Sequence, residues 1–409
     1  SEDMVAYFEL LDLENSKGSN FVEHEFSLNI LSLKQKKWRK TILTTIEELV
    51  LISQTITKKA YYSFNDLEDE NQLLLIEFSN LLFFLIDWHT RLKNSLTFDK
   101  EVSTVLRWAN FVPENVEDTL SFYALKWGNQ SSFVDYLATH SKIVFTSSTL
   151  SFQKSEDYFS SQLKYLPLQF HQFESPYDYS EQVKVMLPEK RINPNEVHKN
   201  DYPKLLAKNI AQILSDTKVN TIVLFRSLSV LREVYELLNL DKRLSDHLIL
   251  AQSISGTRNR ILKNFKRNKP AVILGADSFF EGIDLPDQEL EVIILTRLPF
   301  PSPNTPLNRL KTEYLKEQGV HPFIGEFLPQ AVLKFKQAFG RLIRNKSDVG
   351  VMVVLDDRLL SASYSKDFEE ALPKGVSTEI YPIKSLGKQI KSFLFKQAKN
   401  KEDSMSSQE

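Results

Sequence analysis

The fold is decided most clearly by the stretch AVILGADSFFEGIDLP at residues 271–286. Its four leading apolar residues predict a buried strand, and the polar, glycine-containing run behind them predicts a loop at the carboxyl end of that strand. Further short apolar runs, separated by amphipathic segments, occupy Thr221–Phe225, Leu248–Ala251, Val292–Leu295 and Val349–Leu355. This alternation is typical of an α/β fold with a doubly wound parallel sheet that helices cover on both faces.

The segments between these runs have the periodicity of helices. We expect a helix after Pro203, helices over Ser229–Leu238 and Thr257–Arg267, and a long helix within Pro322–Ile343. In such sheets the functional loops lie at the carboxyl ends of the strands. The loops after Phe225, Leu274 and Leu295, and the loop before Val349, are therefore expected to carry the site.

The chain before Pro203 has a different character. Ser32–Ile56 and Leu67–Leu96 carry apolar residues at intervals of three and four, which predicts two long helices. Short strands are expected around Phe26, over Val105–Phe111 and over Leu120–Trp127, followed by a helix over Ser131–His140. The apolar run Lys142–Phe145 is predicted to be a buried strand that feeds a polar loop. The stretch up to about Phe98 therefore predicts a helical lobe or insertion.

Composition excludes several classes of protein and site. Hydrophobic residues make up 42% and charged residues 25% of the 409 residues, which is typical of a globular chain and not of a disordered or collagen-like one. The absence of cysteine excludes disulfides, thiolate zinc sites and a cysteine-ligated iron–sulfur cluster, and it fits a cytoplasmic location. The sequence contains no run of about 20 apolar residues, so it predicts no membrane span. The net charge of −2 means that any basic surface must be local.

The loop after Leu274 offers groups that could face a ligand. Gly282 would let the backbone approach a ligand closely, and Asp284 could accept hydrogen bonds from a ribose or from an arginine. The alternative for this segment alone is a glycine turn followed by a helix cap. A hydroxyl cluster, TSSTL at residues 146–150, is similarly ambiguous, because Ser/Thr loops commonly cap helices.

The stretch QAFGRLIR at residues 337–344 places two arginines three residues apart within the expected long helix. On a helix, Arg341 and Arg344 would point the same way. Two guanidinium groups fixed in this manner suit a polyphosphate whose charge grows in a transition state. The alternative is a solvated basic face. The apolar neighbours of these arginines predict a mostly buried helix instead, so the arginines need partners.

Together these motifs resemble the late motifs of superfamily 2 helicases, and the match is best with the DinG family, bacterial relatives of XPD. TSSTL at 146–150 is similar to motif III, SFFEGID at 278–284 to motif V, and residues 337–344 to motif VI. LFRS at 224–227 resembles motif IV, and RLPFPSP at 297–303 is also similar to the family. The resemblance covers roughly residues 102–395.

The resemblance implies a division of the chain. Residues 1–125 would form a mainly helical, arch-like lobe with the last part of motor domain 1, and residues 126–155 the strand and loop of motif III. Residues 156–395 would be a RecA-like motor domain 2, and residues 396–409 a polar tail. Motor domain 2 would hold motifs IV to VI.

The resemblance also implies roles for individual residues. Arg341 and Arg344 would reach the γ-phosphate of ATP, with Arg344 favoured as the arginine finger, and Gln337 would link the motif to the nucleotide. Gly282 and Asp284 would line the nucleotide cleft, and Glu281 would couple it to the DNA side. Motif III would couple the two motor domains through Thr146, Ser147, Ser148 and Thr149. Single-stranded DNA would be gripped by residues at strand ends and nearby loops, namely Phe225, Ser227, Gln252, Arg258 and Ser278.

The departures from the family pattern matter as much. The sequence contains no Gly-Lys-Ser/Thr phosphate loop and no Asp-Glu box for magnesium. It is therefore expected to be the C-terminal portion of a longer helicase that binds ATP with Mg²⁺, uses no iron–sulfur cluster and does not associate with a membrane. Its partners would be the missing N-terminal motor domain and, in the Gram-positive type, a DnaQ-like exonuclease domain of the same polypeptide. By itself the chain would turn over no ATP.

Two alternatives stay open at this point. The chain could be a non-catalytic nucleic-acid-binding or interaction module that keeps a motor fold, or it could be the helicase-like half of a 3′–5′ exonuclease. Asp12 and Glu14 superficially match the metal motif of such an exonuclease, but the residues that follow do not.

Overall fold

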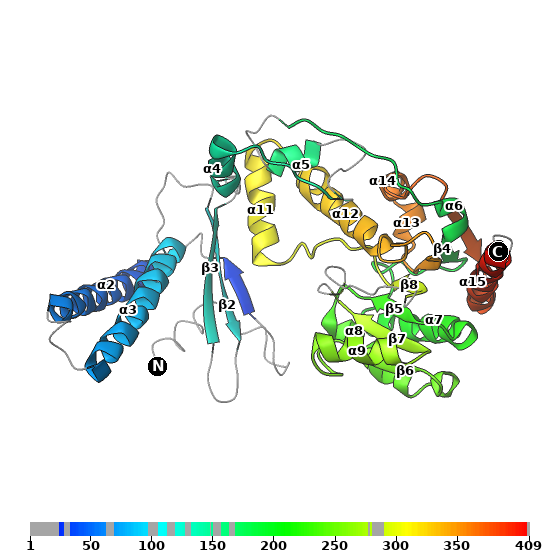
Figure 1. Ribbon diagram of the computed structural model, residues 1–409, viewed down its shortest axis with the longest axis horizontal. Helices are drawn as coiled ribbons and strands as arrows, with labels where there is room; N and C mark the ends of the chain where they lie inside the picture. The colour runs from blue at the N-terminus through cyan, green and yellow to red at the C-terminus, as the bar shows by residue number, and fades with distance from the viewer. Residues whose placement is uncertain are drawn as a thin grey trace. The chain divides into compact units, whose positions relative to one another are not determined.

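The structure is a computed structural model that describes residues 24–27, 33–62, 69–96, 105–112, 119–126, 132–147, 149, 157–162, 168–276, 279 and 290–406. The chain divides into two compact units (Figure 1). The smaller unit combines Ser1–Thr139 with Ser302–Pro322, and the larger unit combines His140–Pro301 with Phe323–Glu409. Residues 302–322 thus belong to the smaller unit, although the residues before and after them in sequence belong to the larger unit.

The larger unit is built on a seven-stranded sheet in which every strand pair is parallel, with strand order β10-β4-β9-β8-β5-β7-β6. The strands are β4 (Val183–Pro188), β5 (Thr221–Leu224), β6 (Leu248–Ala251), β7 (Ala271–Gly275), β8 (Val292–Leu295), β9 (Gly350–Val354) and β10 (Ser377–Tyr381). Because consecutive strands are not always neighbours, the helices between them must cross the sheet, as a doubly wound fold requires. The predicted parallel α/β fold is confirmed.

Both faces of the sheet are buried, each in its own apolar layer. In β5, for example, Ile222 and Leu224 enter one layer while Val223 enters the other, which is the period of two that a strand imposes. One layer is completed by aromatic side chains of α9 (Arg258–Arg267), α12 (Leu328–Phe339) and α14 (Ser365–Glu370), namely Phe265, Phe335 and Phe368. Leucines from α7 (Tyr202–Thr217), α8 (Leu228–Asn239) and α15 (Ile383–Ser406) complete the other, namely Leu206, Leu231 and Leu386. This double burial explains why the central strands read as continuous apolar runs.

The smaller unit contains an antiparallel sheet of order β1-β2-β3, built from β1 (His24–Ser27), β2 (Val105–Val112) and β3 (Thr119–Lys126). Two long helices, α2 (Leu33–Tyr62) and α3 (Asp69–Leu96), pack on each other through residues such as Ile46, Leu75 and Leu82, which are buried. Helix α4 (Ser132–His140) follows β3 in sequence. The long helices confirm the helical periodicity of this region.

Helix α11 (Pro306–Glu317) also belongs to the smaller unit, where it packs against β1 and β2. It begins with Thr305, whose hydroxyl accepts a hydrogen bond from the backbone N–H of Asn308, and with a proline in the first turn. The sequence patterns do not predict this helix. Its only deeply buried apolar residues are Leu310 and Tyr314 among those described, so its hydrophobic stripe is too short to stand out.

Three expectations differ from the structure. Lys142–Phe145 forms no strand and Val144 is 84% exposed, because a strand needs a neighbour for its backbone groups and none of the described residues pairs with it. The long helix within Pro322–Ile343 is divided into a π-helical turn (Phe323–Phe327) and α12, which ends at Phe339. Helix α15 continues to Ser406, past the start of the expected polar tail at residue 396. None of the described helices combines the length and hydrophobicity that crossing a bilayer requires.

Candidate functional site

The two arginines of the QAFGRLIR stretch lie on a loop and not on a helix. Helix α12 is capped at its carboxyl end by Gly340. After it the hydrogen bonds span three residues, since the N–H of Arg341 donates to the carbonyl of Ala338 at 3.2 Å. The prediction that Arg341 and Arg344 share a helix face is therefore wrong. We call residues 340–348 the arginine loop. Both arginine side chains in it are partly buried.

The arginine loop is held from within by Asp348, which is 5% exposed. One carboxylate oxygen of Asp348 accepts the backbone N–H groups of Arg344 and Asn345, each at 2.8 Å. Leu342 is buried against the start of β9, where a β-carbon added at Gly350 would lie 2.7 Å from it. Gly350 therefore permits a close approach that any larger residue would block.

The loop is also held from outside, by residues that precede β4. Gln182, the last residue of the short helix α6 (Tyr179–Gln182), is 7% exposed. Its Nε2 lies 3.1 Å from the carbonyl oxygens of Asn345 and Lys346 and 3.0 Å from that of Asp348. The hydroxyl of Tyr177 donates to the carbonyl of Arg344. The backbone of the loop is thus fixed on both sides of its arginines.

Gln337 lies on α12, three residues before the loop begins. Its Oε1 is buried and accepts no hydrogen bond from any of the described residues. Burying an amide oxygen without a donor costs free energy, so such an atom is expected to meet a donor when the site is complete.

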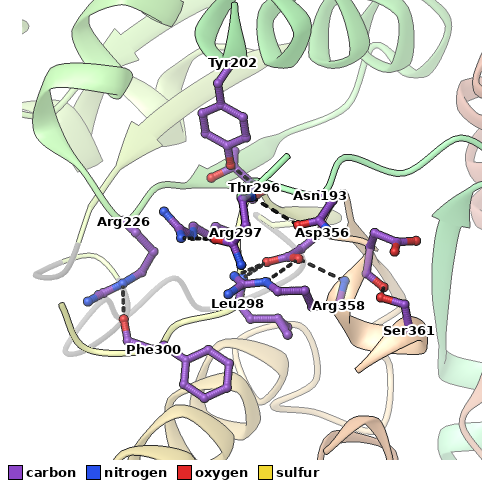
Figure 2. Close-up of polar contacts among 12 residues, drawn as sticks. Asn193, Tyr202, Arg226, Thr296, Arg297, Leu298, Phe300, Asp356, Arg358 and Ser361 are labelled. Carbon is purple, nitrogen blue, oxygen red and sulfur yellow. Dashed lines mark hydrogen bonds and ion pairs between the residues drawn. The ribbon is translucent and has the colours of Figure 1, made fainter. Parts of the chain in front are cut away.

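A second polar cluster lies at the carboxyl ends of β5, β8 and β9 (Figure 2). Asp356 at its centre is fully buried and forms a bidentate ion pair with Arg358, with Asp356–Arg358 distances of 2.6 and 3.0 Å. Asp356 also accepts the backbone N–H of Leu298 at 2.8 Å, which ties the loop after β8 to the loop after β9. We call Arg226, Thr296–Phe300 and Asp356–Arg358 the strand-end cluster.

Hydroxyl groups fasten the same edge to the rest of the sheet. The side chain of Thr296 donates to the carbonyl of Leu224 at 2.8 Å, and the hydroxyl of Tyr202 donates to the carbonyl of Thr296 at 3.1 Å. Burial, reinforced by the charge of Asp356, raises the pKa of Tyr202 well above its ordinary value. Tyr202 therefore stays protonated and remains a hydrogen-bond donor at all physiological pH values.

Two further guanidinium groups project along the strand-end cluster (Figure 2). The Nε of Arg226 donates to the carbonyl of Phe300 at 3.0 Å, and a guanidinium nitrogen of Arg297 lies 3.4 Å from Oδ1 of Asn195. Burial lowers the pKa of Arg226, and the neighbouring charge of Arg297 lowers it further. This edge of the sheet is therefore electropositive, which suits phosphate groups.

The residues expected to bind nucleic acid lie in different environments. Phe225 is fully buried in the core, and its ring cannot stack on a base, so we correct its assignment to a core residue. Ser227 begins α8, and its hydroxyl lies 2.7 Å from that of Ser229. Gln252 follows β6 and accepts the N–H of Ala276 at 2.8 Å. Ser227 and Gln252 thus follow carboxyl ends of the sheet, as the sequence predicted.

Arg258, the first residue of α9, lies with its guanidinium 5.6 Å from the centre of the Phe279 ring. This contact fixes the side chain near the carboxyl end of β7. In the hydroxyl cluster, Ser147 Oγ lies 3.2 Å from the hydroxyl of Thr149 and accepts its backbone N–H at 3.1 Å, while Thr146 is exposed. Several predicted site residues lie outside the described residues, namely Ser148, Ser278, Glu281, Gly282 and Asp284.

The centre of the strand-end cluster is absent from the residues that the sequence motifs predicted. Asp356 and Arg358 directly follow the apolar run Val349–Leu355, so the rule that sites lie at carboxyl ends of strands could have found them. A charged pair after a strand is common, however. Its burial and the contact with Leu298 distinguish this pair from an ordinary surface pair.

Comparison with known proteins agrees with the fold of the larger unit. Residues 210–375 match the family model of the helicase C-terminal domain. The 3′-5′ exonuclease DinG of Bacillus subtilis (strain 168) is 31% identical over 271 residues, which cover 65% of this chain and 29% of that protein. The ATP-dependent DNA helicase YoaA of Haemophilus influenzae is 29% identical over 235 residues, which cover 58% of this chain and 36% of that protein.

A solved XPD helicase structure has a TM-score of 0.50 and 15% sequence identity, covering 88% of this chain and 65% of that one, and it supports the fold alone. The matched part of the chain spans about a third of the length of the two curated relatives. The family model, the curated relatives and the fold agree with one another. The chain therefore carries a helicase C-terminal domain and resembles the DinG-like helicases over that part of its length.

Proposed function

We propose that this chain supplies the second motor domain of an ATP-dependent DNA helicase or translocase. The observation that carries the proposal is the arginine loop, in which Arg341 and Arg344 are partly buried on a backbone that Gln182 and Asp348 fix from two sides. A loop fixed in this way holds its guanidinium groups in place before a ligand arrives. Such preorganised charge is what stabilises a phosphoryl group in transfer.

In this proposal the triphosphate of ATP is held by a phosphate loop on a partner motor domain of the same polypeptide, since this chain has none. Arg344 acts as the arginine finger, and Arg341 adds a second positive charge beside it. The buried Oε1 of Gln337 accepts a hydrogen bond once the nucleotide is in place. Gly282, Asp284 and Glu281 complete the cleft. An arginine finger contributes on the order of 10³–10⁵ in rate in related phosphoryl transfer.

Among the described residues, no three histidine or carboxylate side chains gather as a metal site. We therefore derive no step through Mg²⁺ for these residues.

The strand-end cluster is the proposed path of single-stranded DNA. Arg226 and Arg297 make this edge positive, and Ser227, Gln252 and Arg258 extend it along the carboxyl ends of β5, β6 and β7. Ser278 follows β7 and joins them in the proposal. Contacts of this kind address the phosphate backbone, so binding is expected to depend on salt and to discriminate weakly between sequences. Thr146, Ser147, Ser148 and Thr149 couple this path to the partner motor domain.

The test is Arg344→Ala in the polypeptide that carries both motor domains. We expect ATP turnover stimulated by single-stranded DNA to fall on the order of 10³-fold, because the charge that stabilises the transition state is lost. The affinity for ATP should change by less than about threefold, because the finger acts on the transition state rather than on ground-state binding. Unchanged turnover in this variant would sink the proposal. The chain of 409 residues alone is expected to show no turnover.

A second candidate is favoured by the names of the relatives. Relatives such as that of Bacillus subtilis are called 3′-5′ exonuclease DinG, and this chain covers 29% of that protein. The chain could then be the helicase-like half of an exonuclease in which the motor fold binds nucleic acid without turnover. In that case Arg344→Ala would leave ATP turnover at its background level, while loss of positive charge in the strand-end cluster would weaken DNA binding and slow digestion of the 3′ end.

A further inference from the structure

Gln182 lies outside every motif named above, yet it makes the most concentrated contact with the arginine loop. Its single Nε2 atom points at three backbone carbonyls, at 3.1, 3.1 and 3.0 Å. The amide has two hydrogens, so the three acceptors share them. A neutral side chain that gathers three carbonyls holds the shape of a loop without adding charge to it.

The loop needs such a donor because its helix has already ended. Beyond Phe339 the backbone carbonyls have no helical partners, and the carboxylate of Asp348 can satisfy only N–H groups. The backbone N–H of Asp348 donates to one carbonyl of the loop, that of Asn345, at 3.1 Å. The carbonyls of residues 345, 346 and 348 face the opposite side, where Gln182 is the donor. Without it the buried carbonyl of Asp348 and the partly buried carbonyl of Lys346 would lose this donor, which costs free energy and favours a different loop conformation.

The register of the sheet places Gln182 at this point. Val183, the next residue, begins β4 and pairs in parallel with Gly350, the first residue of β9. Gly350 follows Asp348 by two residues, so the pairing of the two strands sets Gln182 beside the end of the loop. Asp178 caps α6 by accepting the N–H of Ser180 at 3.1 Å, which fixes the turn that presents Gln182.

We propose that Gln182 is a positioning residue for the arginine finger. It does not touch the nucleotide; it fixes the backbone next to Arg344, and Tyr177 supports it by donating to the carbonyl of Arg344 itself. The inference rests on the proposed function, in which Arg344 meets the γ-phosphate. A displacement of about 1 Å in a group that must meet a transition state can cost on the order of 10² in rate, so a loosened loop lowers turnover without removing the charge.

The experiment compares variants of the polypeptide that carries both motor domains, at saturating single-stranded DNA. Gln182→Ala is expected to lower kcat on the order of tenfold while KM for ATP stays within about twofold. Gln182→Glu has nearly the same shape but turns a carboxylate toward carbonyl oxygens, so it should not rescue kcat. Tyr177→Phe removes one hydroxyl and is expected to lower kcat by about two- to fivefold; it serves as the test if Gln182→Ala does not fold.

The matched control is Gln397→Ala. Gln397 is 9% exposed, and its side-chain amide donates one hydrogen bond, to a carboxylate oxygen of Glu181 at 3.1 Å. Glu181 is the neighbour of Gln182 in sequence. Its loss should lower the unfolding temperature in the same way but leave kcat unchanged. If Gln397→Ala lowers kcat as much as Gln182→Ala does, the effect is general loosening of the domain and the positioning role is wrong.

A double variant separates this inference from the proposed function. Because Gln182 acts through Arg344, Gln182→Ala should cost nothing further once Arg344→Ala is present. If the double variant loses kcat by the product of the two single losses, the positioning role is overturned. It is also overturned if Gln182→Ala keeps the wild-type kcat while Arg344→Ala is defective. In both cases the finger itself would stand. Wild-type kcat in Arg344→Ala would instead overturn the proposed function.

Discussion

The arginine loop and the strand-end cluster belong to the same unit, but they are held together by opposite means. The arginine loop is shaped by neutral donors and by one carboxylate that binds only backbone N–H groups. The strand-end cluster is centred on a fully buried ion pair between Asp356 and Arg358. The two regions should therefore respond differently to mutation. Loss of a neutral donor can change the conformation of the arginine loop while the domain stays folded, whereas loss of one partner of the buried ion pair destabilises the whole domain.

The largest effect is expected from breaking the buried pair. Asp356→Asn leaves the charge of Arg358 in a place where its side chain is only 14% exposed, and it weakens the contact with Leu298. Removing one partner of a buried pair typically costs about 3–5 kcal/mol. The free energy of unfolding, measured by urea titration of the 409-residue chain with far-UV circular dichroism as readout, should fall by that amount. A loss below about 1 kcal/mol would show that the pair is solvated and that the contrast with the arginine loop is wrong.

An intermediate effect is expected from the arginine that extends the strand-end cluster. Arg297 makes one long contact with Asn195 at 3.4 Å, so Arg297→Gln should leave the stability of the chain nearly unchanged. Loss of one phosphate contact should weaken binding to an oligothymidylate by roughly fivefold and reduce the slope of log affinity against log salt by about one. Fluorescence anisotropy at several salt concentrations measures both.

The control for this prediction is Arg243→Gln. Arg243 lies in the short 3₁₀ turn Lys242–Leu244 before the amino end of β6, on the opposite edge of the sheet, and pairs with Asp241 at 2.6 Å. It should change neither the affinity nor the salt slope. Equal losses for Arg243→Gln and Arg297→Gln would mean that DNA binds by general attraction and that no path runs along the strand-end cluster.

The smallest effect is expected from the exposed pair itself. Hydrogen bonds from Arg243 hold the pKa of Asp241 below its ordinary value. Because the pKa of Asp241 is depressed by folding, the pair stabilises the fold at pH values above the ordinary pKa of an aspartate, about 3.9, and this contribution is lost as pH falls through the lower pKa of the folded state. Asp241→Asn should therefore lower the free energy of unfolding by about 0–1 kcal/mol at pH 7, and this difference should vanish at acid pH.

Unfolding curves of the wild-type chain and Asp241→Asn between pH 7 and pH 3 test this. A difference that grows on acidification would have the wrong sign for a depressed pKa. A difference near that expected for Asp356→Asn would remove the distinction between the exposed and the buried pair.

Much of the fold could be predicted from local sequence, because the central strands are buried on both faces and leave an unbroken apolar signal such as Val292–Leu295. The end of α12 could not. Leu342 and Ile343 continue the apolar spacing of a helix, and the chain leaves the helix because Gly340 caps it and Asp348 captures the N–H groups of Arg344 and Asn345. A hydrogen bond of that kind is invisible to periodicity.

The site divides in the same way. Gln337, Arg341 and Arg344 were found because they are close in sequence and form a recognisable motif. Gln182 was not, because it is 163 to 166 residues away from the carbonyls it binds, and a lone glutamine carries no pattern. Phe225 was assigned to DNA from its motif, but an aromatic ring one residue past a buried strand fills the core instead.

The amino-acid sequence by itself determined the parallel α/β layer, the family resemblance and the positions of the motif arginines, since apolar periodicity and short motifs are properties of neighbouring residues. Only the tertiary structure decided that the arginines stand on a clamped loop, that Asp356 and Leu298 meet, and that Gln182 closes the clamp. These contacts depend on which strands lie side by side. Strand order is set by the packing of the whole sheet, so no segment of the chain contains it alone.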